Sequence, residues 1–216
     1  MSHDERRFKT DQERFWAGAF GTEYIERNRD ERDVAANVAL FARALRTASP
    51  IEDCIEFGAN IGLNLRALQL LFPSSRLRAI EINPMAAKML AAVIPAENIF
   101  HGSILDFEPD GLHDLVLIKT VLIHINPDYL EAVYERLYRS CRRYILVCEY
   151  YNPNPVVVPY RGHQERLFKR DFAGELLDRY PDLSLADYGF VYRRDPKFPQ
   201  DDVNWFLLAK RTGAHA

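Results

Sequence analysis

Two kinds of segment alternate from residue 51 to residue 150, and few architectures accept that pattern. Short apolar segments predict strands at 51–57, 77–82, 98–101, 115–119 and 144–149. Between them, apolar residues at helical spacing predict helices at 63–72, 84–93 and 128–141. Parallel neighbours need a crossover, and helical crossovers cover both faces of a sheet. The sequence therefore predicts an open α/β sandwich with a mostly parallel sheet.

The segments on either side of this region differ from it. Aromatic residues interrupt the charged residues 1–33 and predict an ordered cap, or simply an attachment to the core: Phe15, Trp16, Phe20 and Tyr24. A further helix follows and ends before Ser49-Pro50, which makes residues 1–48 a helical amino-terminal cap. After residue 150 we expect a helix at 168–180 and two strands, at 185–193 and 204–210, that pair antiparallel at a sheet edge.

Length and charge exclude several classes of protein. A chain of 216 residues allows one ordinary domain. Its net charge of −3 argues against binding to a nucleic-acid backbone. The longest apolar runs are far shorter than the ~20 residues that span a bilayer, so no membrane segment is predicted. The charged residues 1–7 do not resemble a secretory signal.

Cysteine and histidine usage predicts neither disulfides nor a metal site. The three cysteines, Cys54, Cys141 and Cys148, lack C-x-x-C spacing and fit a reducing cytoplasm. The histidines show no ligand spacing either: His3, His101, His113, His124, His163 and His215. We therefore expect a cytoplasmic protein without a bound metal.

A glycine-containing loop follows the first predicted strand. Ligands bind at the carboxyl ends of strands in open α/β sheets, and Gly58 and Gly62 let the backbone approach a ligand closely. The dinucleotide motif G-x-G-x-x-G is incomplete, since Asn60 stands where its second glycine would be. Glu56 would repel a pyrophosphate but would suit a ligand that carries an amine.

Two further positions follow the second and third strands. Glu81, at the end of the second strand, can accept hydrogen bonds from both hydroxyls of a ribose. Ser103 and Ile104, after the third strand, could lie at the edge of an adenine ring. Each signal alone is common among solvated or turn residues, whereas their order along the chain is specific.

This ordered set resembles the class I S-adenosylmethionine-dependent methyltransferases. The resemblance implies a Rossmann-like sandwich, with a mostly parallel seven-stranded sheet whose last strand is antiparallel and with helices on both faces. It implies S-adenosylmethionine as the cofactor, with Glu56, Gly58, Asn60 and Gly62 at its methionine part, Glu81 at its ribose, and Ser103 and Ile104 at its adenine; Ile82 is a further expected cofactor-binding residue. Lys119 and Thr120, where the fourth strand ends, complete the expected cofactor set.

Four segments carry a narrower resemblance, to the pseudaminic acid biosynthesis-associated methylases: residues 15–21, 24–28, 160–163 and 167–174. It extends the likeness across nearly the whole chain. It implies a single methyltransferase domain over residues 1–216, composed of the cap, a cofactor-binding core at 51–150, and an acceptor-facing insert with closing strands at 151–216.

Two side chains are candidates for the chemistry. Methyl transfer from a sulfonium is an in-line displacement, and a hydroxyl or ammonium acceptor must lose a proton. His124 follows the fourth strand and is the first candidate for the base, although a packed or cofactor-shell role is the alternative. Glu149 ends the fifth strand and could orient the acceptor or accept its proton, or simply pack there.

The expected acceptor-binding residues come from the cap, from the end of the fifth strand and from the insert. They are Tyr24, Arg27, Asn28, Tyr150, Tyr151, Tyr160, Arg161, His163, Lys169 and Arg170. Arg161 offers a planar fork for a carboxylate or phosphate, which favours an anionic acceptor such as a nonulosonic acid or a nucleotide-linked sugar. Alternatively, Lys169 and Arg170 belong to a solvated helix face.

The predicted function is therefore methyl transfer to a small polar acceptor. Alternatives are a catalytically silent S-adenosylmethionine-binding protein and a methyltransferase acting on an amino acid-like molecule. A nicotinamide-dependent oxidoreductase is disfavoured by the missing G-x-G-x-x-G. The acceptor's identity, the choice among oxygen, nitrogen and carbon as the methylated atom, and the oligomeric state stay open, with a homodimer as one alternative.

Overall fold

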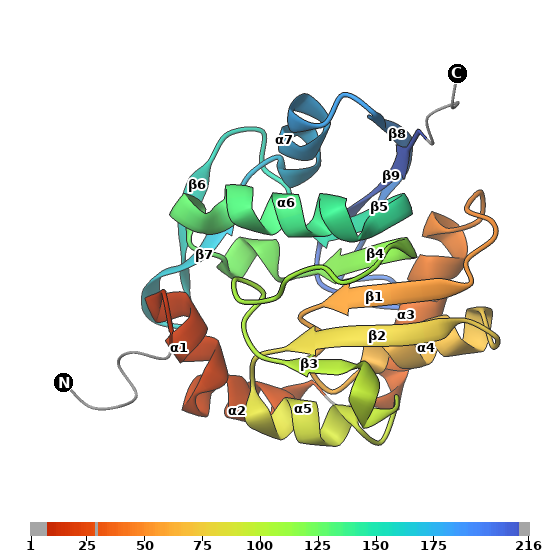
Figure 1. The fold of residues 1–216 in the computed structure, drawn as a ribbon. Helices are drawn as coiled ribbons and strands as arrows, with labels where there is room; N and C mark the ends of the chain where they lie inside the picture. Colours follow the sequence, from red (N-terminus) through yellow and green to blue (C-terminus); the bar gives the residue numbers. More distant parts are fainter. Residues whose placement is uncertain (1–7, 29, 212–216) are drawn as a thin grey trace.

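A computed structural model describes residues 8–28 and 30–211. The charged residues 1–7, with His3, and the carboxyl-terminal His215 lie outside the described residues. A seven-stranded sheet in the order β3-β2-β1-β4-β5-β9-β8 forms the centre of the molecule (Figure 1). Its strands are β1 (Asp53–Phe57), β2 (Arg76–Glu81), β3 (Ile99–His101), β4 (His113–Lys119), β5 (Cys141–Glu149), β8 (Leu183–Val191) and β9 (Val203–Lys210).

The predicted sheet architecture is confirmed. β1 pairs parallel with both β2 and β4, and β4 pairs parallel with β5. β9 pairs antiparallel with β5 on one side and with β8 on the other, so the two closing strands lie at the predicted edge. The strand order reverses between β1 and β4, which is where sheets of this kind bind ligands.

Helices cover both faces of the sheet. Successive residues of each buried strand point to opposite faces, so the apolar side chains on both faces are packed against helices. Ile55 and Phe57 pack with residues of α6 (Leu130–Ser140) and α7 (Phe172–Arg179). Cys54, which precedes Ile55 and points to the other face, packs with α3 (Glu31–Ala44), α4 (Leu63–Leu71) and α5 (Pro84–Leu90). Figure 1 shows α6 in front of the strands and α4 behind them.

Local chemistry explains where α5 begins and ends. The Asn83 side chain accepts hydrogen bonds from the backbone N–H groups of Met85 and Ala86, and Pro84 occupies the first helical position, as predicted. The helix ends at Leu90 instead of residue 93, and residues 91–93 form a turn in which the N–H groups of Ala92 and Val93 bond three residues back, to the oxygens of Met89 and Leu90.

The helix predicted at 168–180 is wrong in its first part. β6 (Val156–Tyr160) and β7 (His163–Lys169) form an antiparallel hairpin, and α7 begins only at Phe172. Leu167 and Phe168 are buried opposite Val158 and Val157, so pairing with a β-branched strand overrides local helix preference.

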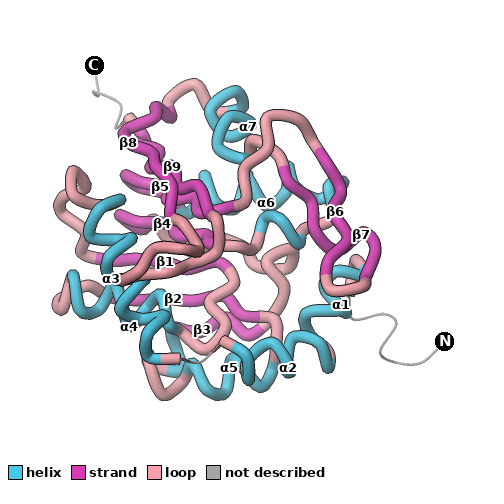
Figure 2. The backbone as a smooth tube through the Cα atoms, turned by 180° about the vertical axis from the view of Figure 1, so that it is seen from behind, coloured by secondary structure: helices cyan, strands magenta, loops and turns pink. Residues whose placement is uncertain are grey.

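The amino-terminal cap consists of α1 (Asp11–Ala17) and α2 (Ala19–Arg27), followed by α3. Thr10 and Glu13 form a reciprocal capping box at the start of α1. Both views show α1 beside the hairpin, and the Gln12 amide donates a hydrogen bond of 3.0 Å to the backbone oxygen of Glu165 (Figures 1 and 2). The cap is therefore attached to a segment more than 150 residues away.

Among residues 8–28 and 30–211, none of the helices combines the length and the hydrophobicity needed to cross a lipid bilayer.

Candidate functional site

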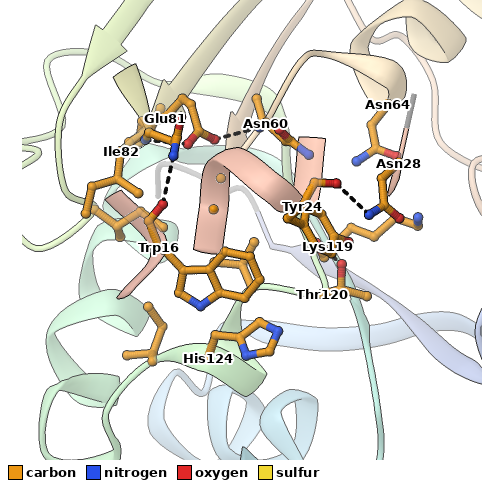
Figure 3. A pocket seen from close by; sticks show the side chains of 18 of the residues that line it. Trp16, Tyr24, Asn28, Asn60, Asn64, Glu81, Ile82, Lys119, Thr120 and His124 are labelled. Carbon is orange, nitrogen blue, oxygen red and sulfur yellow. Dashed lines mark hydrogen bonds between the residues drawn. The ribbon is translucent and has the colours of Figure 1, made fainter. Parts of the chain in front are cut away.

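A cavity of about 480 Å³ opens at the carboxyl ends of β1, β2 and β4. Its floor is formed by the loops that follow these strands and β3. The cap contributes one wall through Trp16 and Tyr24 (Figure 3). The loop between β8 and β9 contributes another. The cavity thus lies where the strand order reverses.

The glycine loop has the backbone geometry that its sequence indicates. Gly58, Asn60 and Gly62 have φ angles of +80°, +49° and +84°. A Cβ at Gly58 would approach the Val121 side chain to 2.5 Å, and one at Gly62 would approach Leu90 to 2.7 Å. Gly58 and Asn60 line the cavity, whereas Gly62 begins α4 and allows it to pack against α5.

Glu81 links the loop to the end of β2. Its Oε2 accepts a 2.6 Å hydrogen bond from the backbone N–H of Asn60, and its Oε1 accepts a 2.7 Å bond from that of Asn83. Burial raises the pKa of Glu81, although these two bonds act in the opposite direction. Because each carboxylate oxygen has two lone pairs, both can accept one more hydrogen bond in the cavity that Glu81 lines.

Ile82, Ser103 and Ile104 line the same end of the cavity, as the sequence predicts. The Ser103 hydroxyl donates its proton to Oε1 of Glu13 and accepts a 3.0 Å bond from the N–H of Leu105. Glu13 also lines the cavity and was missed by sequence reasoning. The T-x-x-E capping pattern of Thr10 and Glu13 predicts the helix start but not this second contact.

Lys119 and Thr120 line the cavity at the other end of the loop, near Asn28 and Asn64 (Figure 3). Thr120 has a φ of +54°, and its N–H donates to the backbone oxygen of Cys148. This turn ends β4 and leaves the ammonium of Lys119 at the site. This end of the cavity therefore combines the cation of Lys119 with amides and with the nearby carboxylate of Asp33.

Glu56 lies beneath the cavity and does not line it. Its side chain is completely buried, and its Oε1 accepts a 2.6 Å bond from the amide of Asn64, which does line the cavity. Burial raises the pKa of Glu56 to about 8, with the Asn64 bond and Lys119 opposing the shift. Its Oε2 has no hydrogen-bond partner among the described residues.

His124 lines the cavity from a short 3-10 turn, Leu122–His124, after β4. Its ring lies 4.6 Å from that of Trp16 and 5.0 Å from that of Tyr160, between centroids. Nδ1 lies 2.6 Å from the backbone oxygen of Arg166 and must therefore donate to it, which leaves Nε2 as the basic nitrogen of the neutral ring. Burial lowers the pKa of His124 to about 4.

Glu149 lies behind this turn and not at the cavity surface. Its Oε1 accepts hydrogen bonds from the N–H groups of Val121 and Leu122, at 2.9 and 2.8 Å. Burial raises the pKa of Glu149 to about 8, against these bonds. The carboxyl group thus fixes the turn that carries His124.

The cap residues predicted to bind an acceptor separate into two groups. Tyr24 and Asn28 line the cavity, and the Asn28 amide donates a 2.8 Å bond to the backbone oxygen of Tyr24. Burial raises the pKa of Tyr24. Arg27 is exposed and lies over the ring of Phe20, 5.4 Å from its centroid.

The predicted residues of β5 and the hairpin do not line the cavity; they are Tyr150, Tyr151, Tyr160, Arg161, His163, Lys169 and Arg170. Arg170 pairs with Glu175 at 3.3 Å, and Lys169 lies over the ring of Tyr150 at 5.1 Å. Arg161 is exposed beside Tyr160. The hairpin therefore contacts the cavity walls from outside.

The loop between β8 and β9 is a part of the cavity wall that the sequence did not reveal. Arg193, Pro199, Gln200 and Asp201 line the cavity. Both polar atoms of the Gln200 amide are buried without a partner among the described residues, and Asp201 accepts a 2.7 Å bond from the Tyr150 hydroxyl. This connection contains no motif, so no signal in the sequence separates it from an ordinary turn.

Within the described part of the chain, no group of three or more histidine, cysteine, aspartate or glutamate side chains could hold a metal ion.

No protein-family model and no curated protein matches the sequence, but solved structures do. A mitomycin 7-O-methyltransferase matches with a TM-score of 0.66 and 16% identity, over 94% of this chain and 61% of that one. The magnesium protoporphyrin IX methyltransferase of Synechocystis matches with a TM-score of 0.65 and 13% identity, over 94% and 98%. An amino pentose methyltransferase of Micromonospora echinaspora gives 0.61 and 12%, over 89% and 96%.

This chain spans less than two thirds of the mitomycin enzyme but nearly the whole length of the other two. The Synechocystis and Micromonospora structures contain bound S-adenosylmethionine. Their sequence identities to this chain are low, so the likeness concerns the fold. The chain has the Rossmann-like α/β fold of S-adenosylmethionine-dependent methyltransferases.

Proposed function

We propose that this protein is an S-adenosylmethionine-dependent methyltransferase that acts on a small polar molecule, with residues 1–216 as one domain. The observation that carries the proposal is the position of Glu81. Its two oxygens hold the glycine loop and the start of α5 and still face a cavity at the reversal of strand order. The fold of the methyltransferases supports the same function.

The residues at the cavity fit the parts of S-adenosylmethionine. Glu81 would accept hydrogen bonds from the ribose hydroxyls, with Ile82 and Ile104 beside the base. Lys119 would bind the carboxylate of the methionine part. Glu56 would act on the amine indirectly, because it accepts the bond that holds the amide of Asn64 at the cavity.

When bound, this cofactor supplies an electrophilic methyl group. The protein's task is then to align the acceptor and to exclude water. Trp16 and Tyr24 would wall the acceptor site, and His124 would accept the acceptor's proton on Nε2 while Nδ1 stays bonded to Arg166. Glu149 would hold the turn that carries His124 and would not touch the acceptor.

For the acceptor we propose a nonulosonic acid or a nucleotide-linked sugar, in line with the resemblance of residues 15–21 and 160–163 to the pseudaminic acid biosynthesis-associated methylases. Arg161, at the exposed end of the hairpin, would meet the anionic group outside the cavity.

A second candidate is an acceptor that carries an amine, such as an amino acid-like molecule. Its support is the charge of the cavity wall, which contains Asp33 and Asp201 while the basic residues of the hairpin lie outside. Aromatic rings near these acids, among them Trp16 and Tyr24, also suit a cation.

Calorimetric titration with S-adenosylhomocysteine tests the proposed cofactor. The wild type should bind it, Glu81→Ala should lose affinity by about tenfold or more, and the exposed Glu97→Ala should behave as the wild type. Folded wild-type protein that releases no heat would overturn the proposal. Incubation with methyl-labelled donor and fractionated small anions and amines would then identify the acceptor class.

A further inference from the structure

One carboxylate stands at the end of the cavity beyond Glu81. Glu13 comes from α1, is only 6% exposed, and lines the cavity together with Ile82 and Ile104. The two isoleucines offer apolar sides to a flat ring. Glu13 is therefore the charged side chain at the place where the donor's base would lie.

The two oxygens of Glu13 have different tasks. Oε2 accepts hydrogen bonds from the N–H of Thr10, at 2.7 Å, and from its hydroxyl, at 3.1 Å. These bonds complete the capping box. Oε1 instead reaches across to the loop after β3 and accepts the proton of the Ser103 hydroxyl. A helix cap alone would not need this second contact.

The contact between Ser103 and Glu13 determines which of their polar groups is free to bond the purine base of the donor. Ser103 gives its only proton to Glu13 and accepts from Leu105, so it has no proton to offer a ligand. Oε1 of Glu13 still has a free lone pair. This end of the cavity therefore presents a hydrogen-bond acceptor with negative charge, which matches an exocyclic amine and opposes a carbonyl oxygen.

We propose that Glu13 is a specificity-determining residue that selects a 6-amino purine in the donor, by accepting a hydrogen bond from its exocyclic amine. This inference rests on the proposed function. It assigns base recognition in part to the amino-terminal cap, which adds a contact to the predicted Ser103 and Ile104.

The test compares two ligands by calorimetry: S-adenosylhomocysteine and S-inosylhomocysteine, in which oxygen replaces the amine. The wild type should bind the adenosyl compound at least about tenfold more tightly, because a carboxylate facing a carbonyl oxygen loses its hydrogen bond. Glu13→Gln should reduce this ratio severalfold or more, since its amide can donate to the oxygen. Glutamine also serves in a capping box, so α1 should persist.

Asp11→Asn is the matched control, because it removes one charge from the same first turn on an exposed side chain. Its ratio of affinities for the two compounds should equal that of the wild type. A general loosening of α1 would change both affinities by the same factor and would leave this ratio unchanged. Equal affinity of the wild type for both compounds, which needs no variant, would overturn the inference. So would an unchanged ratio in Glu13→Gln. Failure of the wild type to bind either compound would instead overturn the proposed function.

Discussion

At the scale of single residues, three buried glutamates show how burial and partners divide tasks among equal side chains. Glu81 and Glu149 end β2 and β5, Glu56 is the last residue but one of β1, and burial raises the pKa of each. Glu81 alone of the three lines the cavity. Glu56 and Glu149 instead hold groups that do, an amide and a backbone turn. A carboxylate at a strand end therefore has to be assigned by its contacts.

His124 yields a prediction at this scale. His124→Ala should lower turnover by about 100-fold or more, while leaving the affinity for S-adenosylhomocysteine nearly unchanged. Because its pKa is about 4, the ring is neutral from pH 5 upward, and its protonation should not reduce the rate at pH 6. Steady-state rates and calorimetry measure the two effects. Equal losses of turnover and affinity would show that His124 shapes the cofactor site instead.

The sequence predicted several cavity residues at the ends of β1, β2 and β4, whereas Glu149 and Tyr150, at the end of β5, do not line the cavity. Gly58, Asn60, Glu81 and Lys119 are in the expected places because the strand ends of a parallel sheet meet at one edge. Glu13 and Gln200 were missed, since each reaches the site from a distant segment through tertiary packing. Local patterns carry no information about such contacts.

At the scale of elements, the sheet was predictable and the insert was not. Buried parallel strands read as short apolar runs, so β1, β4 and β5 were predicted with small errors at their ends. The hairpin was not predicted, and the last two residues of β7, Phe168 and Lys169, were assigned to the following helix. The pairing of β7 with Val156–Tyr160 supplies the stabilisation that makes this segment a strand.

Asn83 gives a prediction about the link between elements. Its Oδ1 caps α5, and its Nδ2 donates a 3.0 Å bond to the backbone oxygen of Trp16. Asn83→Asp should retain the cap but lose the donor, so amide exchange in α1 should rise while α5 stays protected. Asn83→Ala should lose both and lower the free energy of unfolding by about 1–2 kcal/mol. Amide hydrogen exchange and urea unfolding measure these effects. Equal exchange in α5 and equal unfolding free energies in the two variants would contradict the separate roles of Oδ1 and Nδ2.

At the scale of the whole molecule, buried acids make stability depend on pH. Burial raises the pKa of Glu149 to about 8 from an ordinary 4.5, so the folded state keeps a proton that the unfolded chain releases. This contribution is complete below about pH 4.5 and is lost as the pH rises to about 8. Glu56 acts in the same direction.

The melting temperature of the wild type should therefore fall between about pH 5 and about pH 9. Glu149→Gln should reduce this fall, because the amide oxygen can still accept both backbone bonds without a buried charge. Glu97→Gln, on the surface, should melt as the wild type does. Thermal melts followed by circular dichroism test this, and a variant curve parallel to that of the wild type would refute it.

The bond between Gln12 and the Glu165 backbone joins two segments that both lie outside the seven-stranded sheet. An insertion or deletion in either one would displace this contact at the cavity wall, which Gln12 lines, so the other segment must adjust for the wall to keep its shape. Among divergent descendants of this protein, the lengths of residues 8–28 and 150–171 should thus vary in concert, and acceptor preference should follow that joint variation.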